Sequence, residues 1–248
     1  MSRSAARTRP DTSPRSHASA RLGLTLRSVL LAPGIGFSAA LKTTERRARA
    51  GTRPAEGLSA LVLGAVGGAA LMGLWLKVGS LVGLRQACPG PRVALYVTMS
   101  FVMGALVGLI AQALWGALGP RAFGAFHVDV PGRDLRLVWG ASALPQVFAL
   151  VLLLPLDLAI VGTDTFTTAA LDDPVSTGWA AFSIALGISL AVWSFALFVK
   201  GLRVATGTSL KRALAGTGIA ACCLGVFVGL LVVAALATGG EACPTPLG

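Results

Sequence analysis

The sequence predicts an all-helical integral membrane protein: a bundle of five transmembrane helices preceded by an amphipathic segment in the membrane plane. Of the 248 residues, 54% are apolar and only 12% are charged, about half the charged share of an ordinary soluble protein. Five apolar runs each reach the roughly 20 residues that a spanning helix needs. The basic residues are concentrated in alternate loops, as expected of a chain threaded through a membrane.

The chain begins with a segment that we expect to be a disordered, basic cytoplasmic tail. Residues 1–21 contain mainly Ser, Ala, Arg and Pro without an apolar period, a composition typical of disorder. In residues 22–56, Arg27 and Pro33 interrupt a series of apolar residues. A helix lying on the cytoplasmic leaflet suits this pattern, because its basic flanks would face lipid headgroups. A partly ordered linker is the alternative.

The five spans form a membrane domain at residues 57–238, followed by a short outer tail at residues 239–248. We place the spans near residues 58–84, 93–118, 137–161, 178–199 and 213–238. The segments between them are polar or rich in Pro and Gly, as at Gly119-Pro120 and Pro131-Gly132. Such segments are typical of turns at the membrane interface.

The positive charges predict how the chain is oriented. With the N-terminus inside, 18 of the 21 basic residues lie on the inner side, and residues 162–177 on the outer side contain none. This asymmetry predicts a cytoplasmic N-terminus, an outer C-terminus and a place in the inner (plasma) membrane. The N-terminal basic flank should attract anionic lipid. It is not expected to bind nucleic acid, because no aromatic side chains alternate with its arginines.

Side chains suited to catalysis, metal binding or cofactor binding are almost absent from the spans. The two histidines, His17 and His127, lie in the tail and in a loop, so neither a haem nor a zinc site is expected. Asp157 is the only carboxylate inside an apolar run, and Lys77 lies at a similar depth near the outer end of the first span. We expect the two to form an ion pair, or each to reach the headgroups separately. A proton or substrate site at Asp157 is the functional alternative.

The four cysteines form two groups. Cys88 and Cys243 lie on the outer side of the predicted topology, where an oxidising compartment would allow a disulfide. Two unpaired thiols, or lipidation, are the alternatives. Cys222 and Cys223 lie in the fifth span and are interpreted as packing residues.

Glycine and proline spacing predicts how the spans pack. Two glycines four residues apart share a helix face and allow close helix approach, within the chain or between two copies. Three such pairs occur: Gly64 and Gly68, Gly104 and Gly108, and Gly225 and Gly229. Pro145 and Pro155 should kink the third span. With Gln146, they make this helix the one best suited to line a cavity.

Several short motifs occur in a familiar order. These are Leu30-Leu31-Ala32-Pro33 with Phe37, Ala143-Leu144-Pro145, and Trp193 with Gly201-Leu202-Arg203 and Ser209-Leu210-Lys211-Arg212-Ala213-Leu214. In this order the chain resembles the Yip (Ypt-interacting protein) domain family of small five-span membrane proteins, over roughly residues 28–238. The resemblance implies no catalytic residues. Eukaryotic members are associated with Rab-type GTPases, whereas bacterial members, which the Arg-, Ala- and Gly-rich composition favours, have no assigned activity.

These observations predict a non-enzymatic multi-pass membrane protein that organises the membrane or scaffolds partners, either other proteins or further copies of itself. The alternative is a small transporter or permease component acting as an oligomer, with a substrate passing near Gln146 and Asp157. An enzyme is the least favoured class, because no catalytic, cofactor or metal site is predicted.

Overall fold

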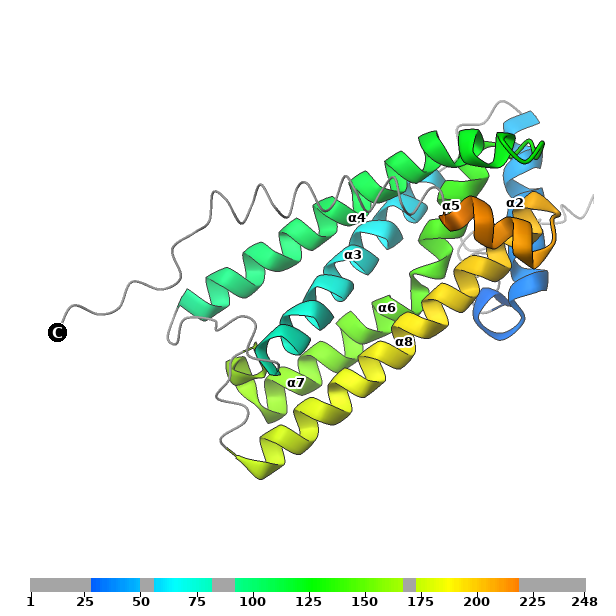
Figure 1. Ribbon diagram of the computed structural model, residues 1–248. Helices are drawn as coiled ribbons and strands as arrows, with labels where there is room; N and C mark the ends of the chain where they lie inside the picture. Colours follow the sequence, from blue (N-terminus) through cyan, green and yellow to red (C-terminus); the bar gives the residue numbers. More distant parts are fainter. Residues whose placement is uncertain (1–27, 50–55, 82–91, 167–172, 219–248) are drawn as a thin grey trace, which may run out of the picture.

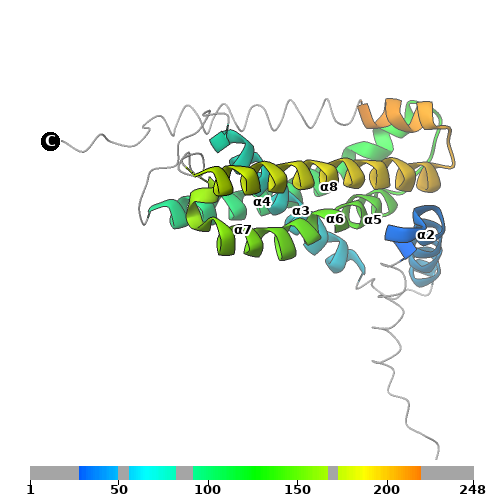
Figure 2. The same ribbon diagram turned by 90° about the horizontal axis from the view of Figure 1, so that it is seen from below.

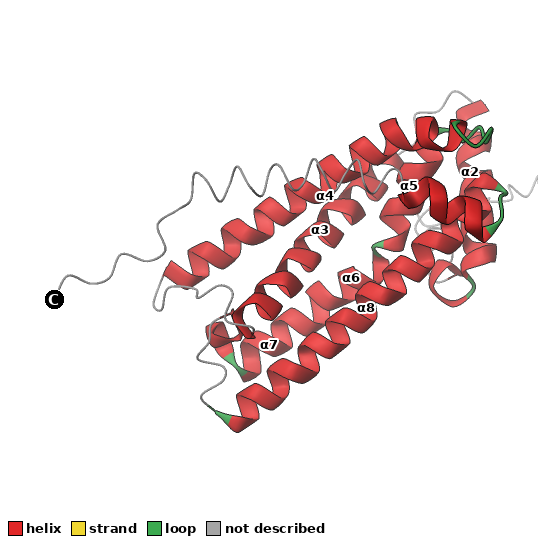
Figure 3. Cartoon of the chain, viewed as in Figure 1, coloured by secondary structure: helices red, strands yellow, loops and turns green. Residues whose placement is uncertain are grey.

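The computed structural model describes residues 28–49, 56–81, 92–166 and 173–218. The elements in these ranges are helical, and none of the described residues forms a strand (Figure 3). Four segments among them are long and apolar enough to cross a membrane: Ala60–Gly79, Val93–Gly124, Gly132–Ile160 and Pro174–Thr206. This confirms an all-helical chain with several potential spans. Most of the predicted fifth span lies outside the described residues, which include only a helical stretch at 210–218.

The four segments lie side by side in a bundle (Figure 1). Three are the continuous helices α3 (Glu56–Leu81), α4 (Arg92–Gly124) and α8 (Pro174–Thr206). The other is divided into α5 (Gly132–Ser142), α6 (Leu144–Phe148), a π-helical turn η1 (Ala149–Leu153) and α7 (Leu154–Ile160). Helix α2 (Pro33–Arg49) lies across one end of the bundle, here called the α2 end (Figure 2). The 3₁₀ turn η2 (Gly162–Phe166) marks the opposite end, here called the η2 end.

Helices α3 and α4 pack closely because glycines face one another along their contact. A Cβ atom on Gly68 would lie 2.8 Å from the Cα atom of Gly108 and would meet the carbonyl oxygen of Gly104. A Cβ atom on Gly108 would meet the carbonyl oxygen of Gly64. Small residues at such contacts let backbones approach and gain van der Waals energy, which matters where lipid supplies little hydrophobic driving force. The pair Gly225 and Gly229 lies outside the described residues.

The third segment departs from regular α-helix near both of its prolines. Pro145 lies in the first turn of α6 and Pro155 in the first turn of α7, directly after η1. A proline cannot donate to the carbonyl four residues earlier, and its ring crowds that carbonyl. Breaks and π-turns accommodate this conflict. In the resulting segment, Gln146 and Asp157 are both buried.

Pro120, in contrast, does not end the second span. The sequence predicted a span near residues 93–118 with a turn at Gly119-Pro120, yet α4 continues through Pro120 to Gly124. Pro120 leaves the carbonyl of Gly116 without its helical donor. A Cβ atom on Gly132 would collide with this carbonyl oxygen. The absence of a side chain at residue 132 therefore lets the start of α5 pack against α4 at this point.

Helix α8 also extends beyond the predicted range of 178–199, because both of its ends are capped. Asp173 accepts a hydrogen bond from the backbone N–H of Ser176 at 2.9 Å. This bond, and a second from the Ser176 hydroxyl, hold the pKa of the Asp173 carboxyl below its usual value of 3.8. At the other end, Gly207 adopts φ +62°, a left-handed conformation that favours glycine and ends helices.

The main core cluster lies at the α2 end. Phe37 of α2 is fully buried, and a Cβ atom on Gly201 of α8 would lie 2.8 Å from its ring. The same core contains Trp115 and Phe198, and the partly buried Trp139 packs against it. The centroids of these three rings are 5.2 to 6.0 Å apart. Helix α2 is therefore anchored to the bundle by a buried aromatic side chain.

Candidate functional site

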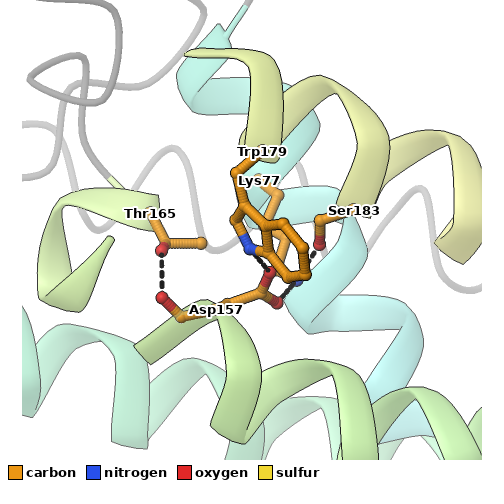
Figure 4. Close-up of polar contacts among 5 residues, drawn as sticks. All are labelled: Lys77, Asp157, Thr165, Trp179 and Ser183. Carbon is orange, nitrogen blue, oxygen red and sulfur yellow. Dashed lines mark hydrogen bonds and ion pairs between the residues drawn. The ribbon is translucent and has the colours of Figure 1, made fainter. Parts of the chain in front are cut away.

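A buried ion pair joins α3 to α7 near the η2 end. Lys77 donates a hydrogen bond from Nζ to Oδ2 of Asp157. Lys77 is 7% exposed and Asp157 is 0% exposed. Because an unpaired charge in an apolar interior is very costly, intramembrane ionisable residues are almost always paired. The structure thus brings together the two ionisable residues that the sequence singled out, and neither reaches outward alone (Figure 4).

Helix α8 supplies two further partners for this pair. The hydroxyl of Ser183 accepts a hydrogen bond from Lys77 Nζ at 3.0 Å. The indole Nε1 of Trp179 donates to Oδ1 of Asp157 at 2.9 Å. Each carboxylate oxygen of Asp157 therefore has a donor, and the cluster ties α3, α7 and α8 together.

Sequence reasoning did not select Trp179 or Ser183. Their spacing of four residues places them on one face of a helix, at the same end of the bundle as Asp157. An indole donor and a hydroxyl on one face near an intramembrane carboxylate are the signal that could have identified them.

The turn η2 folds back against the end of α7 beside the ion pair. The hydroxyl of Thr165 donates to the backbone carbonyl of Asp157 at 3.3 Å. Phe166 packs edge-on against Phe101 of α4, with ring centroids 6.3 Å apart. Gly162 begins the turn with φ +71°, a conformation that glycine adopts without strain. Thr165 and Phe166 are both buried, so η2 shields this side of the cluster from solvent or lipid.

A buried glutamine links three helices between the ion pair and the α2 end. Gln112 of α4 donates from Nε2 to the carbonyl oxygens of Ala60 and Arg136, at 2.9 and 3.0 Å. These carbonyls belong to α3 and α5. A Cβ atom on Gly64 would meet the Oε1 atom of Gln112, so this glycine also leaves room for the amide. Gln112 therefore acts as a cross-link between helix backbones.

A second buried glutamine has a different environment. Gln146 of α6 is 2% exposed, and neither of its amide atoms has a hydrogen-bond partner among the described residues. It lines a cavity of about 20 Å³ whose wall also includes Lys77 and Gly187. Apolar residues form most of its wall, and Lys77 and Gln146 are its only polar lining side chains among the described residues. Its volume is about that of one water molecule. The amide of Gln146 and the side chain of Lys77 therefore border the same cavity.

The remaining predicted residues contribute nothing to this site. His127 is exposed in the turn after α4, with φ +57°. Among the described residues, no three His, Cys, Asp or Glu side chains are grouped so that they could hold a metal ion. Cys88, Cys222, Cys223 and Cys243 lie outside the described residues, and with them the predicted disulfide.

Chemically, the Lys77–Asp157 cluster is neutral overall, and its polar atoms are engaged with one another. Comparison of the chain with protein-family models, with curated proteins and with solved structures finds no match. The resemblance to the Yip family therefore stays a prediction.

Proposed function

We propose that the protein is a non-enzymatic, five-span membrane protein of the Yip type that organises the membrane or scaffolds partners. The observation that carries this proposal is the closed ion-pair cluster. Hydrogen bonds join the side chains of Lys77, Asp157, Trp179 and Ser183 across three helices. Such contacts hold the helices in fixed positions relative to one another. A substrate site would instead present polar atoms to an open cavity.

The charge distribution supports a cytoplasmic α2 end, and therefore a cytoplasmic N-terminus and an outer C-terminus in the inner membrane. The basic side chains at the α2 end belong to α2, to the nearby ends of α4, α5 and α8, and to the helical stretch at 210–218: Lys42, Arg121, Arg133, Arg136, Lys200, Arg203, Lys211 and Arg212. Asp164 and Asp173 lie at the η2 end. This distribution satisfies the positive-inside rule.

Photo-crosslinking in cells tests the scaffolding role. A photoreactive residue would replace Leu95, Met99 or Met103 of α4, each of which is more than half exposed. We expect discrete adducts with a second copy of the chain or with another membrane protein. Positions that crosslink only to lipid or to the same chain would contradict the scaffolding role. A photoreactive residue at the buried Val138 is the control, because it should react within the chain.

A transporter component is the second candidate, and the environment of Gln146 favours it. An unpartnered amide beside a cavity that reaches Lys77 is what a polar pathway through a bundle would require. Proton flux into liposomes containing the full-length protein distinguishes the two functions. The scaffold proposal predicts the same leak as in protein-free liposomes. A flux that Asp157→Asn abolishes in a folded protein would establish transport in its place.

A further inference from the structure

A groove at the α2 end, remote from the ion pair, lies between the start of α2 and the end of α8. It is open to the surroundings and has a volume of about 580 Å³. Pro33 and Ile35 line it on the α2 side, and Lys200, Arg203 and Val204 line it on the α8 side. Its walls therefore combine two cations with apolar side chains.

The two cations are available to a ligand. Lys200 and Arg203 are exposed and have no ion pair or side-chain hydrogen bond with any described residue. Because they are three residues apart, they lie on one face of α8. Together they place two positive charges on one wall of the groove.

The apolar side of the groove is exposed. Ile35, which lines the groove, is 71% exposed. Leu31, which is not a lining residue but directly precedes the lining residue Ala32 in the chain, is 72% exposed. Both residues lie at the α2 end of the bundle. Exposed apolar side chains beside a pair of cations match a phospholipid, whose phosphate and acyl chains are covalently joined.

We propose that this groove binds one anionic glycerophospholipid of the cytoplasmic leaflet. Lys200 and Arg203 contact the headgroup phosphate, and the acyl chains lie along the apolar wall that Pro33 and Ile35 form. Two cations favour a lipid with net negative charge over a zwitterionic one, because the ammonium group of the latter would be repelled. This site goes beyond the proposed function, because a scaffold and a transporter could both carry it, and only its assignment to the cytoplasmic leaflet rests on the proposed orientation.

The test titrates phosphatidylglycerol into the full-length protein in neutral detergent and counts bound lipids by native mass spectrometry. Lys200→Gln/Arg203→Gln should weaken binding at least tenfold, since charge-assisted hydrogen bonds to phosphate are lost. The matched control is Lys211→Gln/Arg212→Gln, which removes the same charge from exposed residues at the same end of the bundle. The control should change binding less than twofold. Equal losses in both double variants, or no loss in either, would overturn the proposal.

Two further arms identify the source of the phosphate. Phosphatidylcholine should bind more weakly than phosphatidylglycerol to the unmodified protein. Ile35→Asn should weaken phosphatidylglycerol binding while leaving the protein folded, as judged by thermal unfolding. If soluble glycerol phosphate binds as tightly as the diacyl lipid, the groove is a site for a free anion and the lipid assignment is wrong.

Discussion

Removal of either partner of the Lys77–Asp157 ion pair should strongly destabilise the bundle. Asp157→Asn keeps the size of the side chain and an acceptor for Trp179, but it leaves the buried Lys77 ammonium without a counter-charge. Breaking a buried pair in this way costs about 3–5 kcal/mol. Because Ser183 still accepts from Lys77 at 3.0 Å, we expect a loss near the lower limit, about 3 kcal/mol.

The converse change tests the same pair from α3. Lys77→Met replaces the lysine stem with an apolar chain of similar length, but it leaves the carboxylate of Asp157 with the indole of Trp179 as its only side-chain donor among the described residues. We expect a loss of about 3–5 kcal/mol. The double variant Lys77→Met/Asp157→Asn carries neither charge, so it should be more stable than either single variant. The coupling free energy should therefore exceed about 2 kcal/mol.

The assay is reversible unfolding of the full-length protein in mixed micelles, followed by helical circular dichroism. Ser183→Ala and Ser189→Ala provide matched variants on α8. The Ser183 hydroxyl accepts from Lys77, whereas the exposed Ser189 hydroxyl donates only to the carbonyl of Ala185 in its own helix. Ser183→Ala should therefore cost more than Ser189→Ala. A coupling below about 0.5 kcal/mol, or equal effects of the two serine variants, would refute the structural role of the pair.

Three other predictions concern packing, buried amides and capping. Gly68→Ala should lower the free energy of unfolding by about 1–3 kcal/mol, because its methyl group meets α4. Gly79→Ala, with no atom within 4 Å of its Cβ, should be neutral or stabilising. Equal unfolding transitions for the two variants would contradict this packing. Gln146→Met should leave the free energy of unfolding unchanged or higher, because it removes an unpartnered amide. Gln112→Met should lower it by about 1–2 kcal/mol, because it breaks two hydrogen bonds. A larger loss for Gln146→Met than for Gln112→Met would indicate that the Gln146 amide has a hydrogen-bond partner. Asp173→Ala should lower the melting temperature, because the folded carboxyl has a depressed pKa. The difference from the unmodified protein should be constant above pH 3.8 and shrink as the pH falls through the lower folded pKa; a difference that grows in acid would contradict the capping role.

The position of the ion pair shows how far sequence reasoning reaches. A helix rises about 1.5 Å per residue. The first and third predicted spans cross the membrane in the same direction, and Lys77 and Asp157 each lie about 20 residues into their span, so the sequence places them at similar depth. Counting does not show which helix faces meet, however. Trp179 and Ser183 entered the cluster only through the rotation of α8 against α3 and α7, which packing along the whole bundle determines.

Pro120 and Gly132 illustrate the same limit for helix ends. Local rules placed a turn at Gly119-Pro120, because proline rarely lies inside a helix. In the structure the carbonyl that Pro120 cannot bond is approached by Gly132 from α5. Gly132 lies 16 residues after Gly116 in the chain, so this close contact between α4 and α5 is a tertiary feature that the local pattern around Pro120 does not show.

The amino-acid sequence alone determined that the chain is helical and suited to a membrane, because these properties depend on composition and on the length of apolar runs. It also determined which residues have no ordinary place in such an interior, namely Lys77, Asp157 and Gln146. Only the tertiary structure decided how each was accommodated. Lys77 and Asp157 are neutralised by one another and by α8, and Gln146 is left beside a cavity. The physical reason is that the free-energy cost of burying a polar or charged group is a property of that residue alone. Offsetting this cost requires atoms from other helices, and the packing of the whole bundle determines where those atoms lie.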